Sequence, residues 1–167
     1  MEIKMQADFY KLAKQVGIAL EKRELMLATA ESCTGGQIAQ IITSVSGSAC
    51  WFERGFVTYS NDAKQEMLGV VPEIIETYGA VSEQTAKQMA EGAIAYSHAQ
   101  TSLAVTGIAG PTGGTKTKPV GTICFAWAGE NMKTQTMQQH FDGNRTSIRS
   151  QAAQFVLENL VSFIKTH

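Results

Sequence analysis

One stretch, residues 29–36, constrains the fold of this chain more than any other. It reads T-A-E-S-C-T-G-G, follows the apolar run at 25–28 and precedes residues 37–42, whose apolar side chains recur at helical spacing. The pattern predicts a strand, a tight turn that carries Ser32, Cys33 and Thr34, and then the start of a helix. Unpaired N–H groups and a partial positive charge make a helix start suitable for an oxyanion or a phosphate. A simpler interpretation stays open here, namely that Ser or Thr caps the helix and the glycines shape the turn.

Strand-like and helical patterns alternate along the rest of the chain. Helices are predicted at about 7–23, from 37, from 61, at 73–77, from 83 to about 97 and from about 145; strands are predicted at 25–28, 52–59, 103–105, 120–128 and 132–141. The last two strands, joined by a turn at 129–131, are typical of an antiparallel hairpin at or near a sheet edge. The alternation therefore predicts one α/β domain over residues 1–167, with a mixed sheet.

Composition and charge exclude several classes of protein. The formal net charge is −1, which does not suggest the broad basic surface of a nucleic-acid-binding protein. The three cysteines, Cys33, Cys50 and Cys124, include no C-x-x-C pair, so they argue against a disulfide framework or structural zinc and fit a reducing compartment. The first residues lack the apolar core of a signal peptide, and no apolar run reaches membrane-spanning length. We expect a cytoplasmic protein that binds neither nucleic acid nor a membrane.

The candidate chemistry is hydrolytic and independent of metal or other cofactors. His98, His140 and His167 are scattered, and no H-E-x-x-H motif or carboxylate cluster with ligand spacing occurs. The same scarcity of histidine argues against a Ser-His-Asp triad, so a nucleophilic serine would need another base. A lysine can serve if burial lowers its pKa enough to leave the amine partly neutral.

Two further features allow alternatives. Cys33 is a rival nucleophile, because a helix start favours a thiolate, although no histidine occupies an obvious partner position and a small buried cysteine filling the turn is commoner. The second glycine-rich loop, T-G-I-A-G-P-T-G-G at 106–114, is not a P-loop because no G-K-[ST] follows it. Its backbone N–H groups could still cradle a phosphate.

Six motifs occur together and in order. They are T-A-E-S-C-T-G-G at 29–36, Y-S-N-D-A-K at 59–64, G-A-V-S at 79–82, T-G-I-A-G-P-T-G-G at 106–114, K-P-V-G at 118–121 and G-N-R-T-S-I-R at 143–149. In combination they resemble the C-terminal domain of the competence/damage-inducible protein CinA, over nearly the whole chain after the first helix. The resemblance implies a three-layer α/β/α sandwich around a mixed, mostly parallel sheet. It also implies hydrolysis of the carboxamide of nicotinamide mononucleotide to nicotinate mononucleotide and ammonia.

The resemblance also implies the roles of individual residues. Ser32 is the expected nucleophile, Lys64 the expected base and Tyr59 an assisting hydroxyl. For the oxyanion and the rest of the substrate, the expected residues are Cys33, Thr34, Gly35, Thr106, Gly107, Gly110 and Arg145. One departure from the family is a turn usually written P-G-S-S, which here reads S-G-S-A at 46–49 and touches none of the catalytic positions.

Two alternative functions and the oligomeric state remain open after the motifs have been considered. The chain could be a non-catalytic nucleotide-binding protein related to competence, although such a protein would not need to keep Ser32, Tyr59 and Lys64 together. It could also hydrolyse another small amide, a difference that the sequence does not resolve. The sequence does not give the oligomeric state either, and for so small an enzyme we expect a homodimer.

Overall fold

A five-stranded sheet forms the middle layer of the protein. The computed structural model describes residues 2–166. Its strands are β1 Leu27–Glu31, β2 Phe52–Val57, β3 Thr101–Gly107, β4 Thr122–Gly129 and β5 Met132–His140, in the order β2-β1-β3-β4-β5. β1 pairs in parallel with β2 and β3, whereas β4 runs antiparallel to β3 and β5. The mixed, mostly parallel sheet and its antiparallel hairpin at one edge are therefore confirmed.

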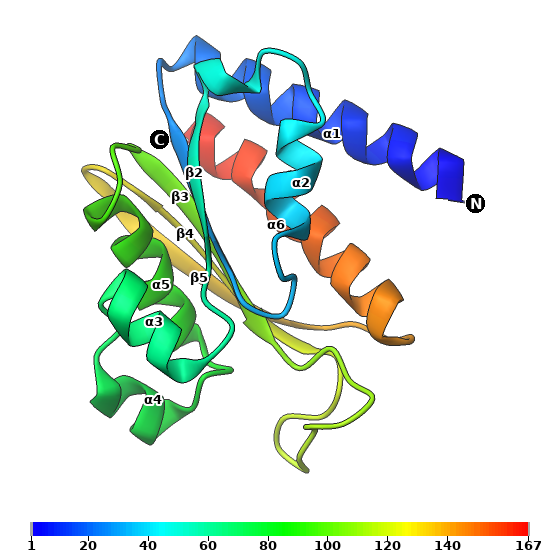
Figure 1. The fold of residues 1–167 in the computed structure, drawn as a ribbon, viewed down its shortest axis with the longest axis vertical. Helices are drawn as coiled ribbons and strands as arrows, with labels where there is room; N and C mark the ends of the chain where they lie inside the picture. Colours follow the sequence, from blue (N-terminus) through cyan, green and yellow to red (C-terminus); the bar gives the residue numbers. More distant parts are fainter. Residues whose placement is uncertain (1, 167) are drawn as a thin grey trace.

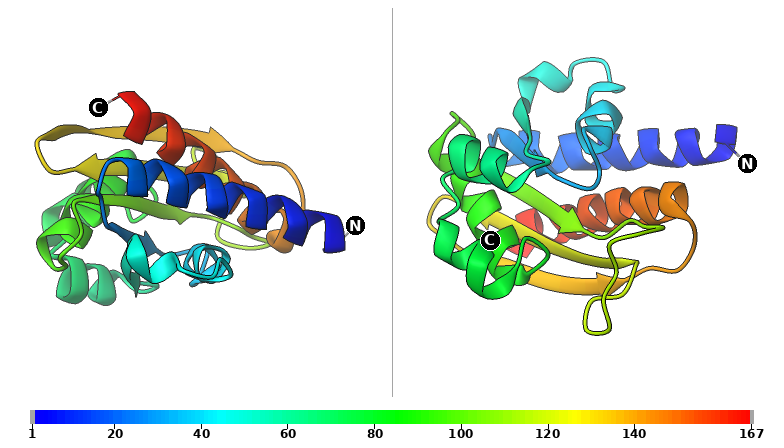
Figure 2. Two further views of the ribbon diagram at one scale, coloured as in Figure 1. Left: turned by 90° about the horizontal axis from the view of Figure 1, so that it is seen from above. Right: turned by 60° about the horizontal axis from the view of Figure 1, so that its bottom comes forward.

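Helices form the other two layers. The helices are α1 Glu2–Lys22, α2 Gln37–Thr43, α3 Asn61–Leu68, α4 Pro72–Tyr78, α5 Glu83–Ala95 and α6 Arg145–Thr166, with a short 3₁₀ turn, η1, at Ser48–Cys50. α1, α2 and α6 pack on one face of the sheet, with α1 and α6 side by side, while α3 and α5 pack on the other (Figure 1; Figure 2). The predicted α/β/α sandwich is confirmed.

The two faces of the sheet differ in the size of their side chains. Toward α1 and α6 the sheet presents large side chains: Leu27, Leu103, Val105, Ile123, Phe125 and Trp127. Toward α5 it presents mostly alanines: Ala28, Ala30, Ala104, Ala126 and Ala128. Small side chains let a helix approach closely, and Ser102 Oγ accordingly donates to the carbonyl oxygen of Ala90 in α5, at 2.6 Å. α3 then packs against α5, which brings its buried residues to the end of β1.

Several predicted boundaries differ from the structure, with β2 ending at Val57 rather than at residue 59 and β3 covering residues 101–107 rather than 103–105. α1 begins at Glu2 rather than near residue 7, so Ile3 and Met5, which the prediction left out, also lie in the helix. The first strand covers 27–31 rather than 25–28, and every residue in it is buried. The strand continues through the polar Thr29 and Glu31 because β1 is paired on both sides, by β2 and β3. Strand identity here is decided by pairing rather than by hydrophobicity.

Candidate active site

The candidate site lies where the parallel strands end. Ser32 follows β1, Thr58 and Tyr59 follow β2, and Thr106 and Gly107 end β3. In sheets of this kind, side chains at the carboxyl ends of neighbouring strands converge on a crevice. A pocket of about 220 Å³ is found there, lined by Ser32, Cys33, Tyr59, Asn61, Lys64, Ala80, Val81, Thr106, Gly107, Ala109 and Arg145. Of the residues expected to bind substrate, Thr34, Gly35 and Gly110 are not among those that line it.

Lys64 and Ser32 meet directly in this pocket. Lys64 Nζ donates to Ser32 Oγ at 3.0 Å and to the carbonyl oxygens of Thr58 at 2.9 Å and Tyr59 at 3.3 Å. The lysine is only 1 % exposed, and within residues 2–166 no carboxylate lies in ion-pair distance of it. Burial lowers the pKa of Lys64 below its usual value, because desolvation penalises the charged form. In its neutral form the amine can reverse this contact and accept the hydroxyl proton of Ser32.

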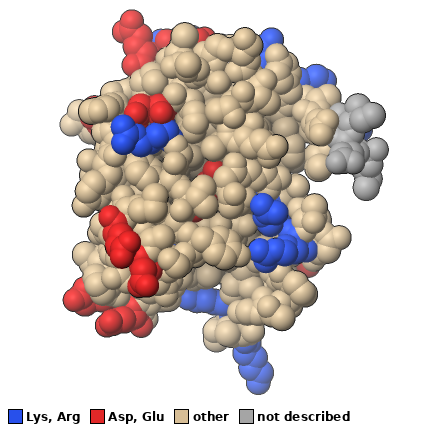
Figure 3. All heavy atoms as spheres, viewed as in Figure 1, with Lys and Arg blue, Asp and Glu red and all other residues tan. Residues whose placement is uncertain are grey.

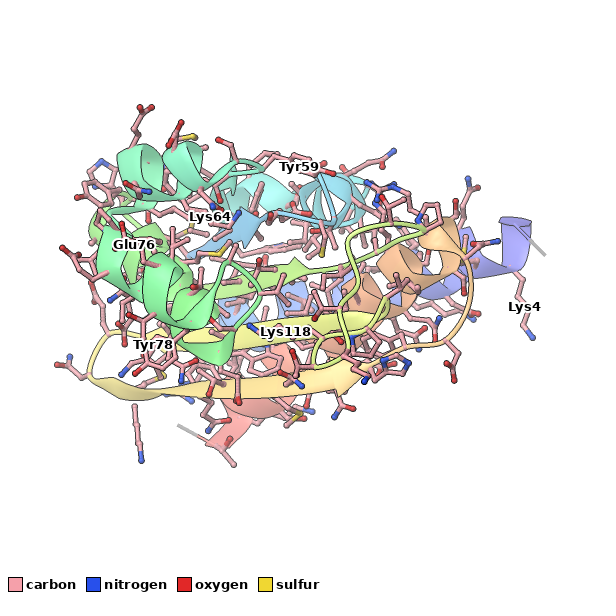
Figure 4. All side chains as sticks on the ribbon, turned by 90° about the horizontal axis from the view of Figure 1, so that it is seen from below. Lys4, Tyr59, Lys64, Glu76, Tyr78 and Lys118 are labelled. Carbon is pink, nitrogen blue, oxygen red and sulfur yellow. The ribbon has the colours of Figure 1, made fainter. Side chains whose placement is uncertain are left out.

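Local structure explains why Lys64 reaches the serine. The hydroxyl of Ser60 accepts from the N–H of Ala63, so Ser60 caps α3 and fixes the start of the helix. Lys64 then lies one turn into α3, and its side chain extends toward the carboxyl ends of β1 and β2. Figure 4 labels Lys64 and Tyr59, which come from α3 and from the segment just before it.

Cys33 lies next to the nucleophile candidate but is not prepared to react. Its side chain is buried, and burial raises the pKa of the thiol to about 12. The thiol therefore stays protonated at neutral pH, and only the thiolate is a good nucleophile. The helix start that was expected to favour a thiolate lies further along the chain, because α2 begins at Gln37.

The start of α2 is already occupied by the protein itself, so its first N–H groups are not open to a substrate anion. Gly36 is the N-cap, with φ of +95°, and the next free N–H groups belong to Ile38 and Ala39. They donate to Oε1 and Oε2 of the buried Glu31, at 2.9 and 3.1 Å. A carboxylate at a helix N-terminus satisfies the same donors and dipole that a substrate anion would use. This role of Glu31 was not predicted from the sequence, where the available signal is a lone acid in a buried strand.

The turn leaves fewer backbone donors than predicted. The N–H of Gly35 donates to the carbonyl oxygen of Ser32 at 3.0 Å, which closes the turn and removes Gly35 as an oxyanion donor. Within the described chain, the N–H groups of Cys33 and Thr34 donate to no oxygen. These two remain the backbone donors nearest to Ser32 in sequence.

Tyr59 points its hydroxyl away from the serine–lysine pair. The side chain is 61 % exposed, and its hydroxyl accepts from Arg145 Nη2 at 3.0 Å. Among residues 2–166, no hydrogen bond joins that hydroxyl to Ser32 or Lys64, and Tyr59 contacts Lys64 through its carbonyl oxygen instead. The geometry does not support the expected relay of a proton through the phenol. The carbonyls of Tyr59 and Thr58 orient Lys64, a role of Thr58 that sequence reasoning missed.

Arg145 stands at the rim of the pocket. Its Nη1 donates to the carbonyl oxygen of Gly110 at 2.9 Å, and no carboxylate of the described residues lies in ion-pair distance of it. Asn144 caps α6 through its Oδ1, which accepts from the N–H of Ser147 at 2.9 Å. The guanidinium is therefore held by neutral groups and keeps its positive charge uncompensated.

The second glycine-rich loop is shaped mainly by packing. A Cβ on Gly107 would lie 2.8 Å from the backbone carbonyl oxygen of Thr122, so the neighbouring strand β4 favours glycine there. The next N–H, that of Ile108, donates to the carbonyl oxygen of Thr122. Thr106 Oγ1 donates to the carbonyl oxygen of Ala80 at 2.9 Å and so ties the segment before α5 to the pocket. Thr106 and Gly107 line the pocket, whereas Gly110 contributes a carbonyl oxygen that holds Arg145.

Two kinds of feature are absent from residues 2–166. No group of three or more His, Cys, Asp and Glu side chains in this range could hold a metal ion. No helix in the same range is long and apolar enough to cross a membrane.

Comparisons with known proteins give the family of this chain. The CinA C-terminal domain family profile matches residues 9–164. The chain is 48 % identical over 157 residues to the nicotinamide-nucleotide amidohydrolase PncC of Enterobacter agglomerans, covering 93 % of this chain and 96 % of that protein. It is 46 % identical over 154 residues to the protein of the same name from Escherichia coli K12, covering 92 % and 93 %. The crystal structure of the competence/damage inducible protein CihA from Agrobacterium tumefaciens superposes with a TM-score of 0.89 at 46 % identity, over 93 % of this chain and 94 % of that one. This chain belongs to the CinA C-terminal domain family.

Proposed function

We propose that this protein hydrolyses the carboxamide of nicotinamide mononucleotide, giving nicotinate mononucleotide and ammonia. The observation that carries the proposal is the contact of 3.0 Å between Ser32 Oγ and the buried amine of Lys64. A nucleophile within hydrogen-bond reach of a base with a lowered pKa is the arrangement that acyl transfer requires. The relatives named nicotinamide-nucleotide amidohydrolase supply the substrate, because the pocket alone defines only a small amide.

The chemistry follows from the positions of the groups. Neutral Lys64 takes the proton of Ser32 while Oγ attacks the carboxamide carbon, and the N–H groups of Cys33 and Thr34 stabilise the tetrahedral oxyanion. One such donor is worth about 3 kcal/mol in comparable sites. The Lys64 ammonium then protonates the leaving nitrogen, and ammonia departs. The same amine, neutral again, activates a water that hydrolyses the acyl-enzyme.

The far end of the substrate is assigned to Arg145. A pocket of about 220 Å³ suits the pyridine carboxamide better than a whole nucleotide, so the ribose and phosphate extend toward the rim. There the uncompensated guanidinium of Arg145 is presented by Gly110 and Tyr59. A guanidinium has more N–H donors than these two contacts use, and it binds phosphate well. Thr106 and Gly107 also line the pocket.

The deciding experiment is incubation with nicotinamide mononucleotide while ammonia and nicotinate mononucleotide are both followed. We expect equimolar release by the wild type, a loss of about 10⁴-fold or more in kcat for S32A, and substantial activity for C33A. Substantial activity in S32A with loss in C33A would make this a cysteine enzyme. No turnover at any pH would favour a non-catalytic nucleotide-binding protein. Turnover of other small amides but not of nicotinamide mononucleotide would show that the proposed substrate is wrong.

We also propose that the enzyme works as a cytoplasmic homodimer. The small size of the chain and its unpaired cysteines support this. Light scattering would then give twice the 18.0 kDa of one chain. A mass of 18.0 kDa at micromolar concentration would contradict the dimer.

A further inference from the structure

A second arginine of α6 holds the turn that carries the nucleophile. Arg149 Nε donates to the carbonyl oxygen of Cys33 at 3.1 Å, and its Nη2 donates to the carbonyl oxygen of Thr34 at 2.9 Å. Arg149 is half-buried, and no carboxylate of residues 2–166 lies in ion-pair distance of it. On the face shown in Figure 3, basic side chains gather where the beginning of α6 meets this turn. Both acceptors are neutral carbonyl oxygens, so neither of them balances the positive charge of Arg149.

The two contacts determine the direction of one N–H group. In a planar trans peptide the C=O and the N–H point to opposite sides. Because the carbonyl of Cys33 points to Arg149, the N–H of Thr34, in the same peptide, points away from Arg149. That N–H donates to no oxygen among the described residues. In the next peptide, between Thr34 and Gly35, the carbonyl oxygen also accepts from Arg149. The N–H of this peptide belongs to Gly35 and donates to the carbonyl oxygen of Ser32, which closes the turn.

We propose that Arg149 is a positioning residue, which orients and polarises the peptide between Cys33 and Thr34 so that the N–H of Thr34 is ready for the oxyanion. This inference rests on the proposed amide hydrolysis at Ser32. A charged donor on the carbonyl forms a stronger hydrogen bond than a neutral donor and polarises the peptide it binds. A donor already in place needs no reorganisation when charge develops in the transition state, which is where such groups act. Both contacts of Arg149 are to backbone carbonyl oxygens of the turn, so it acts through the peptide and not on the substrate.

The test compares R149M, R149K and a control, R23M, with the wild type on nicotinamide mononucleotide. Methionine keeps the length of the side chain and removes the donors, and lysine keeps the charge but cannot hold two carbonyls with one rigid fork. Arg23 is a matched control, since its Nη1 donates to the carbonyl oxygen of Ile164 at 2.7 Å, remote from the pocket. We expect kcat of R149M to fall about 100-fold, that of R149K to fall less, and that of R23M to stay within about twofold, with KM nearly unchanged in all.

An aldehyde analogue of the substrate separates positioning from a structural role. Pyridine-3-aldehyde mononucleotide can form a hemiacetal with Ser32, whose oxygen stands where the oxyanion forms. We expect R149M to weaken the binding of this analogue in parallel with kcat, while R23M leaves it unchanged. Thermal unfolding of each variant shows whether it is folded at the temperature of the assay. If R149M does not fold, the comparison is made with R149K instead.

Distinct outcomes would overturn the inference. Unchanged kcat in R149M, or a raised KM with unchanged kcat, would show that Arg149 does not position the turn. Equal kcat losses in R149M and R23M would assign the effect to general stability. Wild-type turnover is measured first, so its absence would overturn the proposed function itself, whereas turnover without an effect of Arg149 would overturn this inference alone.

Discussion

At the scale of single residues, Lys64 is the side chain whose surroundings depart most from what its type prefers. Lysines are almost never fully buried without a charged partner, yet this one is 1 % exposed and bonded only to neutral oxygens. Desolvation lowers its pKa. A structural lysine would gain from an acid nearby, whereas a base at neutral pH gains from having none. The local environment therefore favours chemistry over stability.

The first prediction concerns Lys64 as the base. K64R should lose activity nearly as completely as K64A, by about 10²–10⁴-fold, because a guanidinium does not deprotonate near neutrality. In the wild type kcat/KM should rise with pH, because the neutral amine is the active form. The midpoint of that limb should lie below the usual lysine pKa, since burial lowers it. Steady-state rates across pH check both points, and wild-type-like activity in K64R would show that only a positive charge is needed.

The second prediction concerns Arg145. If it binds the phosphate, R145A should lose about 10²-fold in kcat/KM with nicotinamide mononucleotide. It should differ little from the wild type with nicotinamide riboside, because the group that Arg145 serves is missing. Both enzymes are measured on both substrates. Equal fractional losses on the two substrates would show that Arg145 does not recognise the phosphate.

At the scale of elements, close packing between α3 and α5 sets the position of Lys64. A Cβ on Gly92 of α5 would lie 2.0 Å from the carbonyl oxygen of Leu68 in α3. Leu68 lies one helical turn after Lys64, so the two helices cannot move apart without moving the base. Gly17 of α1 is also crowded, since a Cβ there would lie 2.7 Å from the nearest Trp51 ring atom, but it lies on the other face of the sheet.

The third prediction uses this pair of glycines. G92A and G17A should each lower stability by about 1–3 kcal/mol through overpacking, reduced by roughly 1 kcal/mol of gained helix propensity. Only G92A should also lower kcat, because only there does the strain displace α3. Denaturant unfolding and initial rates of the folded variants test this. Equal effects on kcat would mean that the position of α3 does not control the base.

At the scale of the whole molecule, the candidate site is assembled from all three layers. Ser32 comes from the end of a strand, Lys64 from α3 on one face, and Arg145 and Arg149 from α6 on the other. Neither helical layer can form the site alone. Function should therefore depend on the two hydrophobic clusters folding as one unit.

The fourth prediction tests this dependence. Leu20 of α1 and Met89 of α5 are fully buried on opposite faces, so L20A and M89A should each cost about 2–5 kcal/mol. Both tryptophans lie in the cluster beneath α1 and α6, so their fluorescence reports on that face. In each variant, the fluorescence and activity transitions in denaturant should coincide. Separate midpoints in M89A would show that the two layers unfold independently.

The sequence by itself determined the elements and their layers. Apolar periodicity, caps and glycines are local signals, and they predicted the helices, the edge hairpin and the mixed sheet, apart from shifts of a few residues at several element ends, including those of α1, β1, β2 and β3. The order of the motifs indicated the family, and through it the proposed roles of Ser32 and Lys64. Secondary-structure elements and motifs depend on residues that are close together in the sequence, so they can be recognised from the sequence alone.

Only the tertiary structure decided how the candidate site is organised. The contact between Lys64 and Ser32 spans 32 residues, that between Arg145 and Tyr59 spans 86, and that between Arg149 and Thr34 spans 115. The use of the α2 start by Glu31 likewise depends on the strand directing the carboxylate toward the helix that follows. Hydrogen bonds of this kind depend on distances between separate elements, and packing sets those distances. The residues were visible in the sequence, but their partners were not.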